Sequence, residues 1–372
     1  MSSNNRHTIR IFLAGDVMTG RGIDQILPHP ANPRLHEPYV DSALTYVDLA
    51  EKAHGPISRG VPFDYIWGEA LTELKQRQPD IRLINLETAI TDSENYALKG
   101  INYRMNPENV DCLTAAGIDG CSLANNHVLD WGIEGLMETV QTLDKAKIMS
   151  AGAGKDIWQA REPAVFDLPE KGRVIVFAFG LGSSGIGRDW GATEMKAGVN
   201  LLPDLSPATS DRIAEEIASV KQPRDVVVVS IHWGGNWGFE IDQDEIAFAH
   251  RLVDEAGVDI VHGHSSHHAK GIEIYRGKLI LYGCGDFLND YEGISGHEAY
   301  RDDLPLMYFA DVDASNGRLI DLTTVPLRIE HFRLNRTGRR DMEQIRGILT
   351  RACARFDTDI LLCDDGTLRL AL

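Results

Sequence analysis

The sequence predicts a layered α/β fold around a largely buried sheet. Short apolar runs alternate with amphipathic stretches from Thr8 to about Leu288, and the runs are nearly continuous, as in strands covered on both faces. The 372 residues are 43% hydrophobic and 25% charged, which is typical of a globular chain long enough to bury a sizeable core. This composition excludes a disordered chain.

The predicted elements follow one another in strand and helix order. Apolar runs of strand length are bounded by turn residues, and longer stretches with helical spacing lie between them. Strands are expected over residues 9–14, 81–86, 120–123, 174–179, 226–231, 258–261 and 279–282. Helices are expected over residues 64–76, 110–116, 132–146, 208–220 and 246–256.

The pattern changes after Asp303. Strands are expected over 306–313 and 319–330, joined by a turn that contains Asn316-Gly317, and a helix over 339–356 precedes a hairpin over 360–370. We therefore expect one domain over residues 8–335, with a C-terminal helix and hairpin, residues 336–372, packed on it. The proline-rich stretch 28–62 is too long and irregular for a simple connection and predicts a functional surface loop.

Charge and composition exclude several classes of partner. There are 37 basic and 55 acidic residues, and a net charge of −18 repels nucleic acid and anionic membrane surfaces. No apolar run reaches the length of a membrane span, and the polar N-terminus lacks a signal-peptide pattern, so we expect a cytoplasmic protein. The five cysteines include no C-x-x-C pair, which favours reduced thiols. The oligomeric state is left open.

Polar side chains of the metal-ligand type follow five of the predicted strands. In an open α/β sheet, ligands bind beyond the carboxyl ends of the strands, so residues there can converge on one site. Carboxylate, imidazole and amide groups together suit Mn, Fe or Zn better than Ca. We therefore predict a site for one or two divalent cations. The residues at the five strand ends are Asp16; Asn85 and Glu87; Asn125, Asn126 and His127; His232; and the histidine-rich stretch 262–268.

Each of these residues also has a structural interpretation when it is taken alone. Asp16 fits a turn or helix cap as well as a ligand, and the Asn125-Asn126 pair fits a turn better. His232 fits a partly buried, hydrogen-bonded histidine, and the stretch 262–268 fits an exposed tract. Their recurrence at five strand ends favours the metal site over these separate explanations.

Motifs that would indicate another kind of site are weaker than the pattern at the strand ends. Residues 180–185 match G-x-G-x-x-G after a strand, but no helix is predicted to follow, and dinucleotide binding needs a helix N-terminus for the pyrophosphate. We interpret this segment as a loop at the rim of the site. The sequence contains no Walker A, G-x-S-x-G or H-E-x-x-H motif.

The order and spacing of these motifs resemble the CapA family, named for poly-γ-glutamate capsule synthesis, which looks like a branch of the calcineurin-like metallophosphoesterases. The resemblance covers about residues 8–335. It implies a four-layer αββα sandwich with a two-metal site between two sheets. The motifs that carry it are Gly15-Asp16-Val17-Met18-Thr19-Gly20-Arg21, Asn85-Leu86-Glu87, Ala124-Asn125-Asn126-His127 with Asp130 and Gly132, His232-Trp233-Gly234, Gly263-His264-Ser265-Ser266-His267 and Tyr282-Gly283-Cys284-Gly285-Asp286-Phe287.

The resemblance also implies roles for individual residues. His127 would be the catalytic imidazole, held by Asp130. The implied metal ligands are Asp16 and Glu87, with Glu87 as the bridge; Asn126, His232 and His264 for the second metal; and His267 to complete the first. Two residues depart from the phosphoesterase pattern, because Met18 stands where a histidine would fall and Glu87 where those enzymes have aspartate. The first metal site is therefore expected to be poorer in ligands, with one tight and one weak ion.

These features lead first to metal-dependent hydrolysis of a phosphoester or of a glutamyl or peptide amide bond. Two metal ions can stabilise such a transition state, and His127 would act as general acid or electrostatic stabiliser. Arg21, Arg104 and Lys270 are candidates to bind a substrate carboxylate or phosphate, although surface charge is the simpler explanation for each. Aromatic residues that could line an apolar pocket are Trp233, Trp237, Phe239 and Tyr291.

Two other functions stay open at this point. CapA-like proteins also include epimerases of lasso peptides, so the resemblance admits metal-dependent epimerisation at a peptide Cα, with Asp16 and His297 as acid and base. His297 fits a solvent-facing loop histidine equally well. The third possibility is a non-catalytic accessory of capsule-polymer biosynthesis that keeps the metal site as structure. The substrate is expected to be a small molecule or a peptide.

Overall fold

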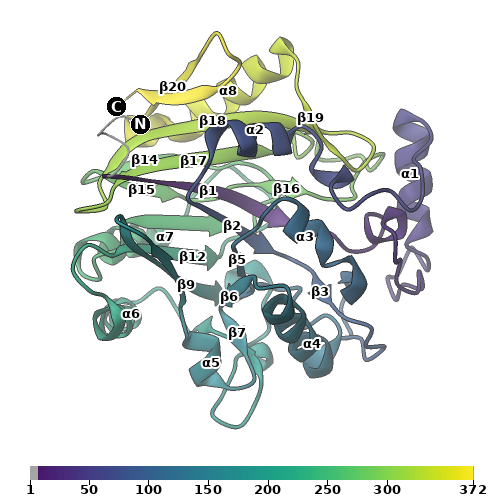
Figure 1. Ribbon diagram of the computed structural model, residues 1–372, viewed down its shortest axis with the longest axis horizontal. Helices are drawn as coiled ribbons and strands as arrows, with labels where there is room; N and C mark the ends of the chain where they lie inside the picture. Colours follow the sequence, from purple (N-terminus) through teal and green to yellow (C-terminus); the bar gives the residue numbers. More distant parts are fainter. Residues whose placement is uncertain (1–6, 372) are drawn as a thin grey trace.

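The computed structural model describes residues 7–371 and contains two large mixed sheets (Figure 1). The ten-stranded first sheet has the order β20-β21-β18-β17-β1-β2-β5-β6, with β16 paired to β1 and β19 to β18. The seven-stranded second sheet has the order β11-β9-β12-β13-β15-β14, with β8 paired to β9. The parallel pairs β1–β2 and β12–β13 form the centre of the two sheets and carry the predicted ligands.

The strands of the first sheet are β1 Thr8–Val17, β2 Ile81–Leu86, β5 Gly120–Ser122, β6 Met149–Ala151, β16 Asp286–Leu288, β17 Leu306–Asp313, β18 Leu319–Ile329, β19 Leu334–Arg336, β20 Asp359–Leu362 and β21 Leu368–Ala371. Those of the second sheet are β8 Ala164–Leu168, β9 Gly172–Leu181, β11 Leu201–Leu202, β12 Val226–His232, β13 Ile260–His264, β14 Ile272–Tyr275 and β15 Lys278–Leu281. Two small sheets pair β3 Ala89–Ile90 with β4 Arg104–Met105, and β7 Ala153–Gly154 with β10 Gly198–Val199.

The helices of the described part of the chain are α1 Leu44–His54, α2 Ala70–Arg77, α3 Asp111–Ala115, α4 Gly132–Lys145, α5 Ile157–Arg161, α6 Pro207–Val220, α7 Gln243–Asp254 and α8 Arg339–Cys353. In Figure 1, α6 and α7 lie beside β9 and β12, whereas α8 lies with β20 beyond β18.

Three apolar clusters define the layers. Along β1, Ile9, Ile11 and Leu13 belong to a cluster shared with β9 and β12, so this cluster fills the space between the sheets. Phe12 and Ala14, the alternate residues, pack instead with α1 to α4 on the outer face of the first sheet. The outer face of the second sheet packs against α6 and α7. This is the expected four-layer αββα sandwich, and burial on both faces explains why the strands read as continuous apolar runs.

The predicted helix over 64–76 is wrong in one respect, because it is interrupted at Gly68. Gly68 has a φ of +44°, and a Cβ there would lie 2.2 Å from the carbonyl oxygen of Leu334. Tyr65–Trp67 therefore forms only a 3-10 turn, and α2 begins at Ala70. The stretch 28–62 also contains more order than predicted, since it includes the eleven-residue helix α1.

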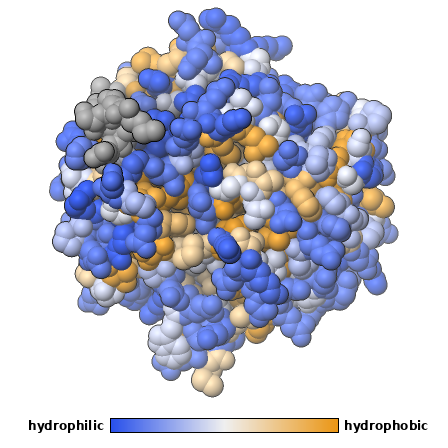
Figure 2. Space-filling view, viewed as in Figure 1, coloured by the Kyte–Doolittle hydropathy of each residue, from blue (hydrophilic) through white to orange (hydrophobic). Residues whose placement is uncertain are grey.

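The C-terminal helix and hairpin contact the sandwich directly. Ile345, Ile348 and Leu349 of α8 join the cluster between the sheets, and β21 pairs with β18. The division of the chain after residue 335 stays a prediction. Within residues 7–371, no helix combines the length and apolar character that crossing a bilayer requires. Figure 2 shows one face of the molecule, on which hydrophilic residues surround smaller apolar areas.

Candidate metal centre

The predicted ligands come together where four parallel strands end. Asp16 lies near the end of β1 and Glu87 directly follows β2, whereas His232 and His264 are the last residues of β12 and β13. The register pairs His232 with His264. All four side chains are buried, between 0% and 2% exposed. Four ionisable side chains buried together need charged or hydrogen-bonding partners, and a bound cation would supply one to all of them.

Asp16, His232 and His264 form the first group of candidate ligands, and one ligand atom of each lies within 4.8 Å of the others. The Nδ1 atoms of the two histidines are 2.8 Å apart, and the Nδ1 of His264 is 4.0 Å from Oδ1 of Asp16. Burial holds the pKa of both imidazoles well below its ordinary value. At neutral pH the rings are therefore uncharged and each offers a lone pair, as metal ligation requires.

Asp16 also belongs to a second group, with His267 and Asp286. Nδ1 of His267 lies 2.8 Å from Oδ1 of Asp286. The sequence led us to expect few ligands here because Met18 replaces a histidine. Asp286, which supplies a carboxylate from β16, was not among the predicted ligands. Its only signal in the sequence was its place in the motif at 282–287, to which we had assigned no role.

A glycine makes this second group possible. A Cβ at Gly15 would lie 1.8 Å from the carbonyl oxygen of Gly285, so only glycine allows β1 and β16 to approach so closely. Asp16 and Asp286 follow these two glycines and are partners in the parallel register. The glycine pair therefore brings the two carboxylates to one position.

Glu87 and Asn126 lie beside the first group. Oε1 of Glu87 is 3.8 Å from Nε2 of His232, and Oδ1 of Asn126 is 3.0 Å from the same nitrogen. Asn85, which precedes Glu87 by two residues, donates to Oδ1 of Asp16 at 2.7 Å. Neighbouring Asn125 lies one hydrogen bond behind the ligands. Its Nδ2 donates to Oδ1 of Asn85 at 3.1 Å, and its Oδ1 accepts the main-chain N–H groups of His127 and Val128.

The electrostatics of the centre favour a cation. Burial and the nearby Asp286 raise the pKa of Asp16 to about 7, and burial with Asp16 raises that of Glu87 well above its ordinary value. Crowded carboxylates resist ionisation until a positive charge joins them. The nitrogen and oxygen donors fit Mn, Fe or Zn, in keeping with the sequence prediction, and the two groups offer places for one or two ions.

His127 lies at the edge of the centre, outside both ligand groups. Its Nδ1 is 2.6 Å from Oδ2 of Asp130, and its Nε2 is 3.7 Å from Oε1 of Glu87. Asp130 is in turn held by Lys99, whose Nζ lies 2.7 Å from Oδ1, and by the main-chain N–H of Tyr103. Burial lowers the pKa of His127 to about 4. Lys99 was not among the predicted site residues, because it lies in an irregular segment that carries no motif.

His297 does not join either ligand group. Its ring stacks on that of Trp237, with centroids 3.7 Å apart, and Trp237 in turn contacts the ring of His267 at 5.1 Å. His297 is exposed and belongs to the loop that follows β16. It therefore lies at the outer side of the centre, one aromatic ring beyond a candidate ligand.

The four residues predicted to bind substrate are buried, and three of them hydrogen-bond to other parts of the chain. Arg21 forms ion pairs with Glu37 and Asp290. Arg104 donates to main-chain carbonyl groups and to a glutamate. Trp233 is 1% exposed and donates to the carbonyl of Tyr282. Lys270 is 5% exposed, and burial lowers its pKa. All four side chains are thus buried in the folded chain, and their role toward a substrate stays a prediction.

The G-x-G-x-x-G segment forms a 3-10 turn at Gly182–Ser184 and no helix follows it. Ser183 accepts the main-chain N–H of Gly234, and a Cβ at Gly185 would contact the side chain of Asn126 at 3.6 Å. The segment therefore lies beside the centre, at its rim.

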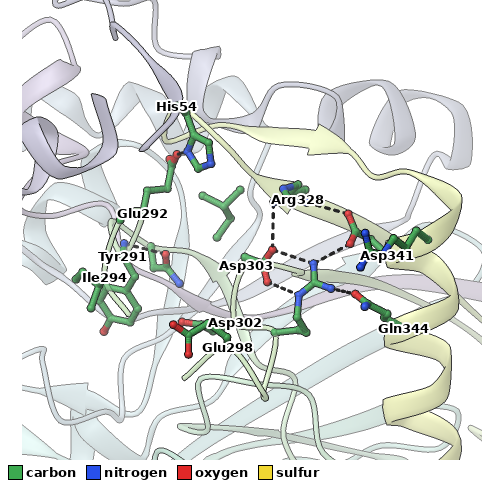
Figure 3. Close-up of a pocket in the computed structure, with 15 residues that line it drawn as sticks. His54, Tyr291, Glu292, Ile294, Glu298, Asp302, Asp303, Arg328, Asp341 and Gln344 are labelled. Atoms are coloured by element: carbon green, nitrogen blue, oxygen red, sulfur yellow. Dashed lines mark hydrogen bonds and ion pairs between the residues drawn. The ribbon is translucent and has the colours of Figure 1, made fainter. Parts of the chain in front are cut away.

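A cavity of about 510 Å³ lies next to the centre (Figure 3). Two of its lining residues also contact the candidate ligands: Asn289 donates to Oδ2 of Asp286, and the ring of Tyr291 lies 5.5 Å from that of His267. On the opposite wall, Figure 3 shows Arg328 beside Asp303 and Asp341. Arg301, which also lines the cavity, forms ion pairs with the same two carboxylates. The cavity is polar and carries both signs of charge.

The chain is similar to several known bacterial proteins. The family model described as bacterial capsule synthesis protein PGA_cap matches residues 10–291. A probable polyglutamine synthesis accessory protein of Mycobacterium tuberculosis is 46% identical over 370 residues, covering 99% of this chain and 97% of that protein. The PGA biosynthesis protein CapA of Bacillus subtilis is 27% identical over 278 residues, 74% of this chain and 62% of that protein. Among solved structures, a Mycoplasma pneumoniae phosphatase aligns with a TM-score of 0.46 at 15% identity, covering 88% of this chain and 95% of that chain.

Proposed function

The chain belongs to the bacterial capsule synthesis protein family, and we propose that it is a metal-dependent hydrolase of a phosphoester or of a glutamyl or peptide amide bond. One observation carries this proposal: Asp16 is shared by two groups of buried ligands, and His127 faces them without belonging to either. A cation that only stabilised the fold would not need this additional histidine with its own buried aspartate and lysine.

His127 is built to exchange a proton at Nε2. Asp130 lies 2.6 Å from Nδ1, which places the ring proton there and leaves the lone pair of the neutral imidazole on Nε2. That nitrogen faces Glu87 and the ligand groups. His127 would take a proton from the attacking water and return it to the leaving group. Lys99 and Tyr103 hold Asp130 and so keep the ring in this orientation.

The bound cations would be held by the two groups that share Asp16. When bound, such cations supply Lewis-acid stabilisation of a phosphoryl or carbonyl oxygen. The burial of the ligands strengthens the electrostatic interactions at the centre. The adjoining cavity would receive the part of the substrate that extends from the reacting bond, with Asn289 and Tyr291 at the junction.

A non-catalytic accessory role is the second candidate, because the relative from Mycobacterium tuberculosis is named as a synthesis accessory protein. In that role the metal centre would support the fold alone. Peptide epimerisation stays a prediction without support from the geometry: Asp16 is shared by both ligand groups, and His297 stacks on Trp237 at their outer side.

The test is turnover by the Mn²⁺-loaded protein of a chromogenic phosphate ester and of a γ-glutamyl anilide, each beside His127→Gln. Turnover by the wild type and its loss in the variant, at equal metal content, supports the hydrolase. Metal binding without turnover of either substrate supports the accessory role. Solvent deuterium incorporated at a peptide Cα without cleavage would instead establish epimerisation.

A further inference from the structure

Three side chains and one main-chain carbonyl form a continuous chain of hydrogen bonds behind the metal centre. Nε2 of His262 lies 2.9 Å from the carbonyl oxygen of Ala14, and Oγ of Ser230 lies 3.1 Å from Nδ1 of His262. The same Oγ lies 2.8 Å from Nε2 of His264. Ala14 belongs to the first sheet and the other three residues to the second, so the chain joins the two sheets. All four residues are completely buried.

The direction of these hydrogen bonds follows from their first member. A carbonyl oxygen can only accept, so Nε2 of His262 must carry a proton. The hydrogen-bond partners of His262 are a carbonyl and a hydroxyl, both uncharged, so the buried ring is neutral and its Nδ1 has a lone pair. Nδ1 therefore accepts the hydroxyl proton of Ser230.

The same reasoning extends to His264. The oxygen of Ser230 has used its proton toward His262, so it can only accept from His264. Nε2 of His264 then carries the ring proton and Nδ1 is left bare. This bare Nδ1 faces Nδ1 of His232 at 2.8 Å and Oδ1 of Asp16 at 4.0 Å.

We propose that His262 and Ser230 are positioning residues that fix His264 in the tautomer whose bare Nδ1 faces the cation. The opposite tautomer would direct an N–H into the centre and leave no lone pair there for a metal. Hydrogen bonds of this kind, made by the ring nitrogen that does not bind the metal, commonly set the tautomer and orientation of a ligand histidine. The inference rests on the metal centre of the proposed function and explains why one of its ligands is preorganised.

An irregularity in β1 lies where this hydrogen-bonded relay begins; the relay consists of Ala14, His262, Ser230 and His264. The pairing of β1 with β2 shifts register between Ala14 and Asp16. Bulges re-aim main-chain and side-chain groups next to functional sites. Here the same irregularity lies between the first member of the relay and Asp16, a ligand shared by both groups.

The first test is the tautomer itself, measured in the metal-free wild-type protein by two-bond ¹H–¹⁵N NMR of the histidine rings. The expected result is a protonated Nε2 and an unprotonated Nδ1 in both His264 and His262. A protonated Nδ1 on His264 would overturn the proposal. This measurement needs neither a variant nor enzymatic activity, so it remains decisive even if the protein proves not to be a hydrolase.

The second test is Mn²⁺ affinity, measured by titration calorimetry on Ser230→Ala. We expect roughly 10–100-fold weaker binding at the site that contains His264, the loss typical of a missing partner to a ligand histidine. The matched control is Ser122→Ala, since Ser122 is also a buried strand serine but its hydroxyl has no hydrogen-bond partner within the described chain. Affinity in Ser230→Ala equal to that of the control would overturn the proposal. The control Ser122→Ala could bind Mn²⁺ as tightly as the wild type while Ser230→Ala binds it more weakly, with neither variant hydrolysing a substrate. That combination would refute the proposed function and leave this inference standing.

Discussion

Asp16 and Asp286 are partners in the register of two parallel strands, although 270 positions separate them in the sequence. Their approach depends on Gly15, which lies against the carbonyl of Gly285 with no room for a Cβ. The consequence is chemical, because Asp286 gives the second ligand group a carboxylate beside Asp16 and His267.

Asp286→Asn should therefore reduce the metal content of the protein without unfolding it. We expect the loss of about one of two bound ions, because the second group is left with Asp16 and His267 while the first group is intact. Elemental analysis after reconstitution with Mn²⁺ measures the change. Asp302→Asn is the control: Asp302 lines the adjoining cavity and belongs to neither group, so that variant should keep its metal. Equal metal content in both variants would contradict the assignment of Asp286.

His127→Gln should separate catalysis from metal binding. His127 lies outside both ligand groups, so we expect unchanged metal content and a fall in kcat of roughly 10²–10⁴-fold, the usual contribution of a general acid–base group. Steady-state kinetics with a substrate that the wild type turns over provide the measurement.

Lys99→Met tests whether Lys99 helps to hold His127 in its orientation through Asp130. Lys99 contacts Asp130, Nδ1 of His127 and the main-chain carbonyl of Asn126, but no member of either ligand group. We therefore expect kcat to fall less than in His127→Gln while the metal stays bound. A loss of metal in either variant would show that this side of the centre is part of the cation site itself.

Arg21→Met should act on stability, although the sequence suggested a substrate role for Arg21. Its guanidinium is buried between Glu37 and Asp290 and lies over the ring of Tyr46 at 3.8 Å. Removing one partner leaves buried carboxylates uncompensated, which typically costs about 3–5 kcal/mol of unfolding free energy.

Denaturant unfolding of Arg21→Met measures this cost, with Arg339→Ala as the comparison. Arg339 pairs with Glu343 in the open, at 85% side-chain exposure, and its loss should change stability by no more than about 0.5 kcal/mol. A stable Arg21→Met protein with a raised KM would restore the substrate role.

The apolar pattern predicted the layered α/β fold well where strands are long and buried on both faces, and the sandwich itself came from the family resemblance. The apolar runs of β1, β9 and β12 could not be mistaken, because each is covered by helices on one side and by the other sheet on the opposite side. Periodicity was less informative at short elements. β16 has three residues within a glycine-containing motif, so no pattern marked it as a strand, and its role as the source of Asp286 went unseen.

At the candidate site, the residue types found at strand ends predicted which side chains lie close together. They did not predict which other side chains those residues pair with. Asp16, Glu87, His232 and His264 do converge, as the topology of parallel strands requires. The ion pairs of Arg21 were not foreseen: one carboxylate, Glu37, is 16 residues away and the other, Asp290, is 269 residues away. Tertiary contacts of this kind leave no local signal, and only the folded chain shows whether a charge is free.

The most direct test of the account is the Mn²⁺ content of the reconstituted wild-type protein and of Asp16→Ala. Because Asp16 belongs to both ligand groups, we predict about two ions per chain in the wild type and almost none in the variant. Circular dichroism should show that both proteins are folded. A wild-type protein without stoichiometric metal, or an Asp16→Ala variant that retains both ions, would contradict the claim that these strand ends form a cation centre.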